Sequence, residues 1–132
     1  MTTPTFIMAA GAPTPVAPFS HAVRVGAWVL VTGQMPTTPG DDEAPLAEGV
    51  RDQTRRVLDN LALVLDAAGC TLSDVVQARV YLTDFERDYA ALNDVWRATW
   101  PPGRLPARTC IGVTALARGA LVEVDLVAYK EL

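Results

Sequence analysis

The sequence predicts a single α+β domain in which a mixed β-sheet of at least four strands carries two helices on one face. Two observations support this fold class. Short stretches rich in β-branched residues alternate between two kinds of side chain, as strands do. Two longer stretches repeat apolar residues at helical spacing instead. Their order along the chain is ββ-α-β-α-ββ, and 132 residues suffice for one domain with a real core.

Residues 1–16 are expected to form an irregular lead-in to this domain. Pro13, Pro15 and Pro18 favour extended or irregular backbone because proline fixes φ and restricts the residue before it. A short strand at Thr5–Met8 is compatible with the pattern. We therefore predict that the regular part of the domain begins after this segment.

A β-hairpin is predicted next. The apolar stretches His21–Val25 and Trp28–Thr32 flank Gly26-Ala27, a short connection typical of hairpins. The segment Pro36–Pro45 contains proline, glycine and acidic residues and is therefore interpreted as a loop.

The first helix is predicted over residues 49–68, with Gly69 as its C-terminal cap. Its apolar residues recur at i, i+3, i+4 and i+7 and would form one buried stripe: Val50, Val57, Leu58, Leu61, Val64, Leu65 and Ala68. The next strand is Val75–Leu82, with Val76 and Ala78 expected on one face and Val75 and Gln77 on the other. Together with Trp28–Thr32, this helix and strand predict a right-handed crossover unit.

The second helix follows a capping-box pattern at Thr83–Glu86 and ends before Pro101-Pro102-Gly103. The residues that it is expected to bury, at helical spacing, are Phe85, Tyr89, Leu92, Val95, Trp96 and Thr99. The tryptophans are most simply packing residues. Two helices can cover only one face of such a sheet, so an apolar opposite face predicts an obligate oligomer.

The last two strands carry the candidate site residues. Arg108 lies on a strand beginning at Ala107, and Glu123 lies on a strand whose other face is an apolar row. Burying either charge unpaired would cost several kcal/mol, so each needs a partner. One interpretation is a structural ion pair or a solvated sheet face. The other is a site that both side chains face, with Arg108 binding a small carboxylate and Glu123 transferring a proton.

Composition excludes several classes of function. The formal net charge of −4 and the scattered arginines argue against an extended nucleic-acid surface. Cys70 and Cys110 make neither a disulfide framework nor a metal site, and Cys110 is most simply an inert packing residue. We expect no metal and no cofactor. No signal-peptide pattern or membrane-length apolar run is evident, so a cytoplasmic protein without membrane contact is expected.

An ordered set of short motifs resembles the Rid family, the reactive intermediate deaminases, also called the YjgF or L-PSP endoribonuclease family. The motifs are Pro18-Phe19-Ser20-His21-Ala22-Val23, Val31-Thr32-Gly33-Gln34, Gln53-Thr54, Val80-Tyr81-Leu82-Thr83-Asp84, Asn93-Asp94-Val95, Pro106-Ala107-Arg108 and Leu121-Val122-Glu123. Each motif alone is weak, but their order and spacing from about residue 17 onward are specific.

The resemblance implies a chorismate-mutase-like fold and a homotrimer whose sheets form a central barrel, with ligand sites in the clefts between subunits. It implies that Arg108 binds the substrate carboxylate and that Glu123 orients a water. Cys110, Gly33 and Asn93 match positions that line the cleft. Phe19 stands in the cleft motif that usually reads Pro-Tyr-Ser-Gln-Ala.

Three departures bear on substrate. Phe19 lacks the hydroxyl of the usual tyrosine, a change of roughly 1 kcal/mol if one hydrogen bond is lost. His21 replaces the usual glutamine, either as a group titrating near neutrality or, more simply, as a packing or backbone-bonded histidine. Gly112 stands where many members carry a larger residue, which predicts a wider pocket.

The resemblance and the residues together imply hydrolytic deamination of enamine or imine acids of the 2-aminoacrylate/2-iminopropionate type, without a cofactor. Alternatives are a specialised deaminase for a bulkier, aminomuconate-like enamine and a non-catalytic regulatory trimer that binds a 2-oxo acid. Ribonuclease activity is disfavoured by the acidic balance.

Overall fold

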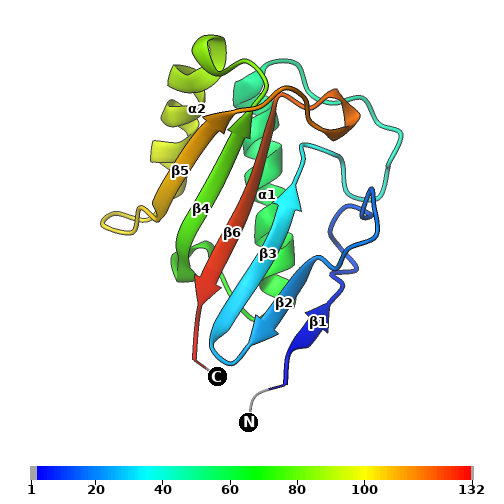
Figure 1. Cartoon of the computed structure of the whole chain (residues 1–132), viewed down its shortest axis with the longest axis vertical. Helices are drawn as coiled ribbons and strands as arrows, with labels where there is room; N and C mark the ends of the chain where they lie inside the picture. The colour runs from blue at the N-terminus through cyan, green and yellow to red at the C-terminus, as the bar shows by residue number, and fades with distance from the viewer. Residues whose placement is uncertain (1–2, 132) are drawn as a thin grey trace.

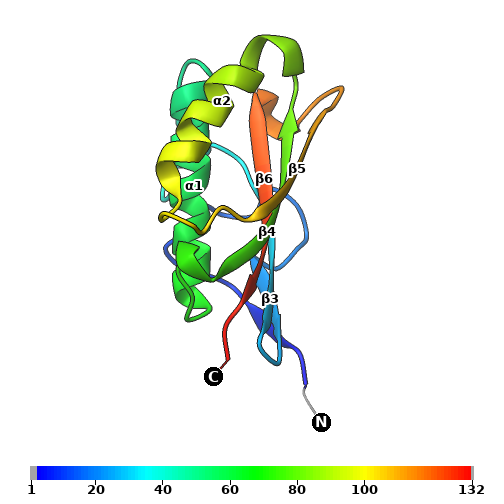
Figure 2. The same cartoon turned by 90° about the vertical axis from the view of Figure 1, so that its left-hand side faces the viewer.

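The structure is a computed structural model that describes residues 3–131, and it confirms the α+β class: a six-stranded mixed sheet with two helices on one face (Figures 1 and 2). The strands are β1 (Thr5–Ile7), β2 (Ala22–Val25), β3 (Trp28–Gln34), β4 (Val75–Leu82), β5 (Ala107–Gly112) and β6 (Val122–Tyr129), and the helices are α1 (Val50–Ala67) and α2 (Phe85–Thr99). Short 3-10 turns lie at Leu72–Asp74 and Ala117–Gly119. Strand β1 corresponds to the short strand that the sequence allowed at Thr5–Met8.

The strand order is β1-β2-β3-β6-β4-β5, so the last strand of the chain inserts into the middle of the sheet. Strand β6 is antiparallel to both β3 and β4, which therefore point the same way, while β5 adds to β4 in parallel. A helix follows each of β3 and β4, since parallel strands need a long crossover. This topology places the strand of Glu123 and the strand of Arg108 on either side of β4.

The core lies between the sheet and the helices. The predicted stripe of α1 is buried, and it packs against the helix-facing row of β6, which is Val122, Val124, Leu126 and Ala128. Each fully buried aliphatic side chain of this kind contributes about 1.5–3 kcal/mol relative to its exposed state. Of the tryptophans, Trp96 and Trp100 are buried, as predicted, and Trp28 is half exposed.

Two local predictions are wrong. Val75 is buried and Val76 is exposed, the reverse of the alternation expected, because the pairing of β4 with β6 shifts between Val75 and Gln77. Such a bulge inserts one residue and exchanges the faces on either side of it. The cap of α2 is Asp84 rather than Thr83, since the Asp84 side chain accepts a hydrogen bond from the backbone N–H of Arg87.

Both helices lie on one side of the sheet and leave the other face uncovered (Figure 2). The side chains on that face are partly apolar, as predicted. Its exposed large residues include Trp28, Leu30 and Ile111, which are 46–49% exposed, and Tyr129 beside Trp28. Polar side chains interrupt this face where Asp125 accepts hydrogen bonds from Arg79 and Tyr81, both at 2.9 Å. Within residues 3–131 the longest helices are too short or too polar to span a membrane.

Candidate functional site

Arg108 lies on the helix-facing side of the sheet. Strand β5 pairs with β4 so that Arg108 stands opposite Ala78, and Ala78 is buried under the helices. Directly opposed residues share a face, so the arginine is directed at α2. Its guanidinium donates to Asn93 Oδ1 at 2.9 Å and to the Tyr89 hydroxyl at 3.3 Å.

Aromatic rings complete this arrangement. The Arg108 Cζ atom lies 5.4 Å from the centre of the Trp96 ring and 5.7 Å from that of Tyr89, within cation–π range. Two hydrogen bonds occupy only part of the five N–H donors of a guanidinium. Arg108 is therefore held in orientation and keeps donors for an anion. We call Arg108, Asn93, Tyr89, Trp96 and Cys110 the Arg108 half-site.

Cys110 is half-buried and follows Arg108 as the next residue of β5 on the same face of the sheet. Burial raises the pKa of its thiol, and the nearby Arg108 charge opposes that rise only in part. The cysteine therefore remains a thiol near neutrality, as expected of a packing residue. Gly112 does not widen the pocket as predicted, because a Cβ there would lie 3.2 Å from Phe85 Cβ. Phe85 occupies the volume that the glycine leaves.

Glu123 lies on the opposite, open side of the sheet. It stands opposite Tyr81 on β4, and its neighbours Val122 and Val124 face the helices. The carboxylate rests against Gly33 of β3: a Cβ on Gly33 would come 2.5 Å from Glu123 Oε2. Glycine at this position allows this close approach, since a side chain there would displace the carboxylate.

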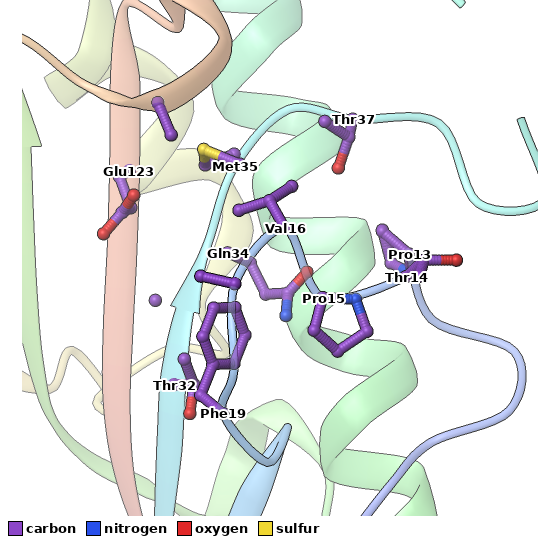
Figure 3. Close-up of a pocket in the computed structure, with 13 residues that line it drawn as sticks. Pro13, Thr14, Pro15, Val16, Phe19, Thr32, Gln34, Met35, Thr37 and Glu123 are labelled. Carbon is purple, nitrogen blue, oxygen red and sulfur yellow. The ribbon is translucent and has the colours of Figure 1, made fainter. Parts of the chain in front are cut away.

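A cavity of about 250 Å³ adjoins Glu123. Its walls come from the lead-in, from the end of β3 and from the loop before β6, and Glu123 is their one charged member among the described residues. The lining residues are Pro13, Thr14, Pro15, Val16, Ala17, Phe19, Thr32, Gly33, Gln34, Met35, Thr37, Ala117 and Glu123 (Figure 3). The cavity is thus mainly apolar with one carboxylate, and we call it the Glu123 half-site.

The environment of Glu123 favours its protonated form. Burial raises the pKa of the Glu123 carboxyl above its usual 4.5, and the like charge of Asp125 raises it further. No hydrogen-bond donor within residues 3–131 contributes an opposing effect on that pKa. A carboxylate whose pKa is raised in this way is a stronger base than an exposed one, and it is free to bond to a ligand or water.

One chain does not bring Arg108 and Glu123 together. The two side chains leave opposite faces of the sheet, so the prediction that both face one site is wrong for the single chain, and the alternative of a structural ion pair between them is wrong for the same reason. The other predicted residues divide cleanly between the two half-sites: Asn93 and Cys110 with Arg108, Phe19 and Gly33 with Glu123.

Buried polar side chains fix the backbone in and around the Glu123 half-site, a role that their place in the sequence did not indicate. Asn60 of α1, fully buried, donates to the carbonyls of Met35 and Thr37 at 3.0 and 2.8 Å. Gln53 of α1 donates to Ala47 O and accepts from the Leu121 N–H. The available signal was a polar residue at the helical spacing of the buried stripe.

His21 is the third such residue. It is buried, accepts a hydrogen bond from the Ala9 N–H and bonds to the Pro13 carbonyl, both at 2.8 Å. The structure therefore confirms a backbone-bonded histidine at this position. Within residues 3–131, no three His, Cys, Asp or Glu side chains are grouped to bind a metal ion.

Comparisons with known proteins agree on one relationship. A family model described as Endoribonuclease L-PSP matches residues 9–130. A RutC family protein from Pyrococcus horikoshii is 37% identical over 125 residues, which cover 95% of this chain and 97% of the relative. A 2-iminobutanoate/2-iminopropanoate deaminase from Mus musculus is 34% identical over 119 residues, covering 90% of this chain and 86% of that protein.

Solved structures give the same result. The crystal structure of RidA from an Antarctic Psychrobacter bacterium superposes with a TM-score of 0.89 at 37% identity, covering 96% of this chain and 99% of that chain. A putative endoribonuclease from Thermotoga maritima superposes with a TM-score of 0.87 at 34% identity, covering 97% and 98% of the two chains. Nearly the whole chain is therefore shared with these proteins.

Proposed function

The chain belongs to the Endoribonuclease L-PSP family, also called the Rid family, and we propose that it hydrolyses reactive enamine and imine acids to 2-oxo acids and ammonia. The substrates are of the 2-aminoacrylate and 2-iminopropionate type. The observation that carries the proposal is Glu123, a half-buried carboxylate with a raised pKa beside a mainly apolar cavity. A carboxylate in such an environment suits general-base catalysis near neutral pH.

Arg108 binds the substrate carboxylate in this mechanism. Its guanidinium is oriented by Asn93 and backed by Trp96, so it can present two parallel N–H donors to an anion. This contact turns the C=N carbon toward the attacking water. Holding the reactants in one geometry is a large part of the catalysis, since it removes the entropy cost of their encounter.

Glu123 moves the proton. It accepts a proton from water while the water oxygen bonds to the C=N carbon, and it returns a proton to the nitrogen. The hydroxyl that the water has become then gives its remaining proton, through Glu123, to the nitrogen. The C–N bond breaks, ammonia leaves with both electrons of that bond, and the carbon becomes the carbonyl of a 2-oxo acid. Each turnover consumes one water and releases one ammonia, and the protein's own side chains carry the protons.

Two copies of the chain complete the site. Arg108 of one subunit and Glu123 of the next would face each other across a subunit interface, because one chain alone does not bring the two side chains together. We infer a homotrimer built on the open face, where Trp28, Leu30 and Ile111 remain exposed. Large exposed apolar patches mark interaction surfaces in soluble proteins.

Subunit complementation tests this arrangement. Arg108→Ala and Glu123→Gln should each lose most of the wild-type rate, and an equal mixture of the two variants, refolded together into trimers, should regain about a quarter of it. That fraction is the share of sites which receive both intact half-sites in a ring of head-to-tail interfaces. If the mixture stays inactive although mass measurement shows mixed trimers, the inter-subunit site is wrong.

The reaction itself is tested by ammonia release from freshly generated 2-iminopropionate and 2-iminobutanoate. Wild-type protein should accelerate release above the spontaneous rate, and Glu123→Gln should not. Equal rates with and without wild-type protein would exclude the deaminase.

A non-catalytic binding protein for a 2-oxo acid is the second candidate, and Phe19 favours it. The ring lines the Glu123 cavity without the hydroxyl that family members usually offer there. Saturable binding of 2-oxobutanoate without turnover of any imine, including bulkier ones, would support this candidate. Ribonuclease activity is least favoured, because a net charge of −4 opposes phosphate binding.

A further inference from the structure

The part of the lead-in that covers the Glu123 cavity lies beyond β1 and belongs to no strand or helix. Residues 13–17 contribute five of the cavity's lining residues. Pro13, Pro15 and Pro18 have no backbone N–H, so this segment cannot join the edge of the sheet by a regular ladder. Its position must therefore be fixed by contacts from outside the segment.

His21 provides those contacts. It immediately precedes β2, and its side chain is 2% exposed. The Ala9 N–H donates to Nδ1, so Nδ1 carries no proton, and the Pro13 carbonyl can only accept, so Nε2 carries it. One neutral imidazole therefore bonds to two backbone groups, of Ala9 and Pro13, which are four residues apart in the chain. Pro13 is where the cavity wall begins. Between these two contacts, the backbone N–H of the buried Ala12 donates a hydrogen bond to the Ala9 carbonyl.

We propose that His21 is a positioning residue for the Glu123 cavity: it fixes the wall of residues 13–17 and so sets how tightly the apolar part of the substrate is held. The proposal rests on the proposed function. His21 itself stays outside the cavity lining and touches no reacting group. Its loss is expected to weaken substrate binding while leaving the chemical step at Arg108 and Glu123 largely intact.

The chemistry of the two contacts predicts which replacements preserve the wall. Glutamine carries one acceptor and one amide donor group at the end of its side chain, the same pair that this imidazole presents. Leucine fills a similar volume and offers neither. His21→Gln should therefore keep both bonds, and His21→Leu should break both and leave the Ala9 N–H and the Pro13 carbonyl without partners.

The experiment compares three variants of the full-length protein. His21→Leu and His21→Gln are set beside Val29→Ala, a matched control that removes buried volume from β3 outside the cavity. Hydrogen exchange of residues 7–18, KM and kcat for 2-iminobutanoate, and the affinity for 2-oxobutanoate are measured for each. Thermal unfolding records the general loss of stability separately.

We expect His21→Leu to speed hydrogen exchange in residues 7–18 and to raise KM about five- to tenfold, because part of the energy of the two lost hydrogen bonds is expressed as weaker substrate binding. The kcat should stay within about twofold. His21→Gln should restore both values. Val29→Ala should lower the unfolding temperature without changing either. An unchanged KM in His21→Leu, or a rise of the same size in Val29→Ala, would overturn the proposal.

Two provisions keep this test separate from the deaminase test. If wild-type protein hydrolyses no imine, hydrogen exchange of residues 7–18 and the affinity for 2-oxobutanoate still report on the wall of residues 13–17. Unchanged values of both in His21→Leu would still overturn the role of His21. If His21→Leu does not fold, His21→Asn replaces it, because its shorter amide cannot reach both partners.

Discussion

The two half-sites differ in how their charged groups are held. Arg108 is bonded to Asn93 and Tyr89 and lies over the ring of Trp96, all on one rigid helix. Glu123 faces a cavity walled largely by loops, and burial together with Asp125 raises its pKa. The first arrangement is suited to binding an anion in a fixed direction, and the second to exchanging a proton. Under the proposed function, the protein would therefore bind the substrate carboxylate with one half-site and transfer the proton with the other.

Removing the reactive group should have the largest effect on this comparison. We expect Glu123→Gln to lower kcat by about 10²–10⁴-fold, the usual contribution of a general base, with KM little changed. Arg108→Ala should instead raise KM as well as lower kcat, because it removes capture. Steady-state kinetics on 2-iminobutanoate separates the two. The same kinetic pattern in both variants would contradict the division of roles.

Gly33→Ala should shift the carboxylate without removing it. The new Cβ would come 2.5 Å from Glu123 Oε2, so the flexible end of the glutamate must move. We expect kcat to fall about tenfold or more, since catalysis is sensitive to misplacement on the order of 1 Å. Thermal unfolding should change little, because no backbone atom is displaced. Gly11→Ala, which has open space around it, serves as the control.

Asn93→Ala should have a smaller effect, limited to the binding of the substrate carboxylate by Arg108. The change removes the acceptor that orients Arg108 Nη1 at 2.9 Å, a bond worth about 1 kcal/mol. KM should rise about fivefold while the pH dependence of kcat is unchanged. Asp94→Ala, at the exposed neighbouring position, should leave KM as it is. A change in the pH profile of Asn93→Ala would show that the half-sites are not independent.

Asp125→Asn should produce the smallest effect, a shift in pH dependence. Glu123 must be ionised to act as a base, so the rate should rise as pH increases through its raised pKa. Removing the negative charge of Asp125 lowers that pKa, because the like charge is one of its two causes, and the acidic limb should move to lower pH. Rate profiles of kcat/KM measure the shift, with Asp66→Asn as the control.

The same shift has a consequence for stability. A carboxyl whose folded pKa is raised contributes stability below its unfolded pKa and loses that contribution as pH rises through the folded pKa. Denaturant unfolding of Asp125→Asn should therefore show a smaller loss of stability across this range than wild type. An identical pH dependence in both proteins would mean that Asp125 does not act on Glu123.

Much of the fold follows from local patterns. The stripe of α1, the hairpin of β2 and β3 and the helix-facing row of β6 follow from periodicity, which local backbone geometry dictates. The bulge at Val76 and the backbone contacts of Asn60 and Gln53 do not follow from periodicity, because they depend on partners distant in sequence. Glu123 and Arg108 stood out as charges in apolar strands, but nothing local linked either one to a cavity.

By itself the sequence determined the fold class, the two helices over one face, and the residues that would carry charge inside strands. Only the tertiary structure decided that Arg108 and Glu123 leave opposite faces of the sheet. Their strands both pair with β4, where Ala78 stands opposite Arg108 and Tyr81 opposite Glu123. A shift of either register by one residue would reverse that strand's faces, and register is set by contacts between strands distant in the chain.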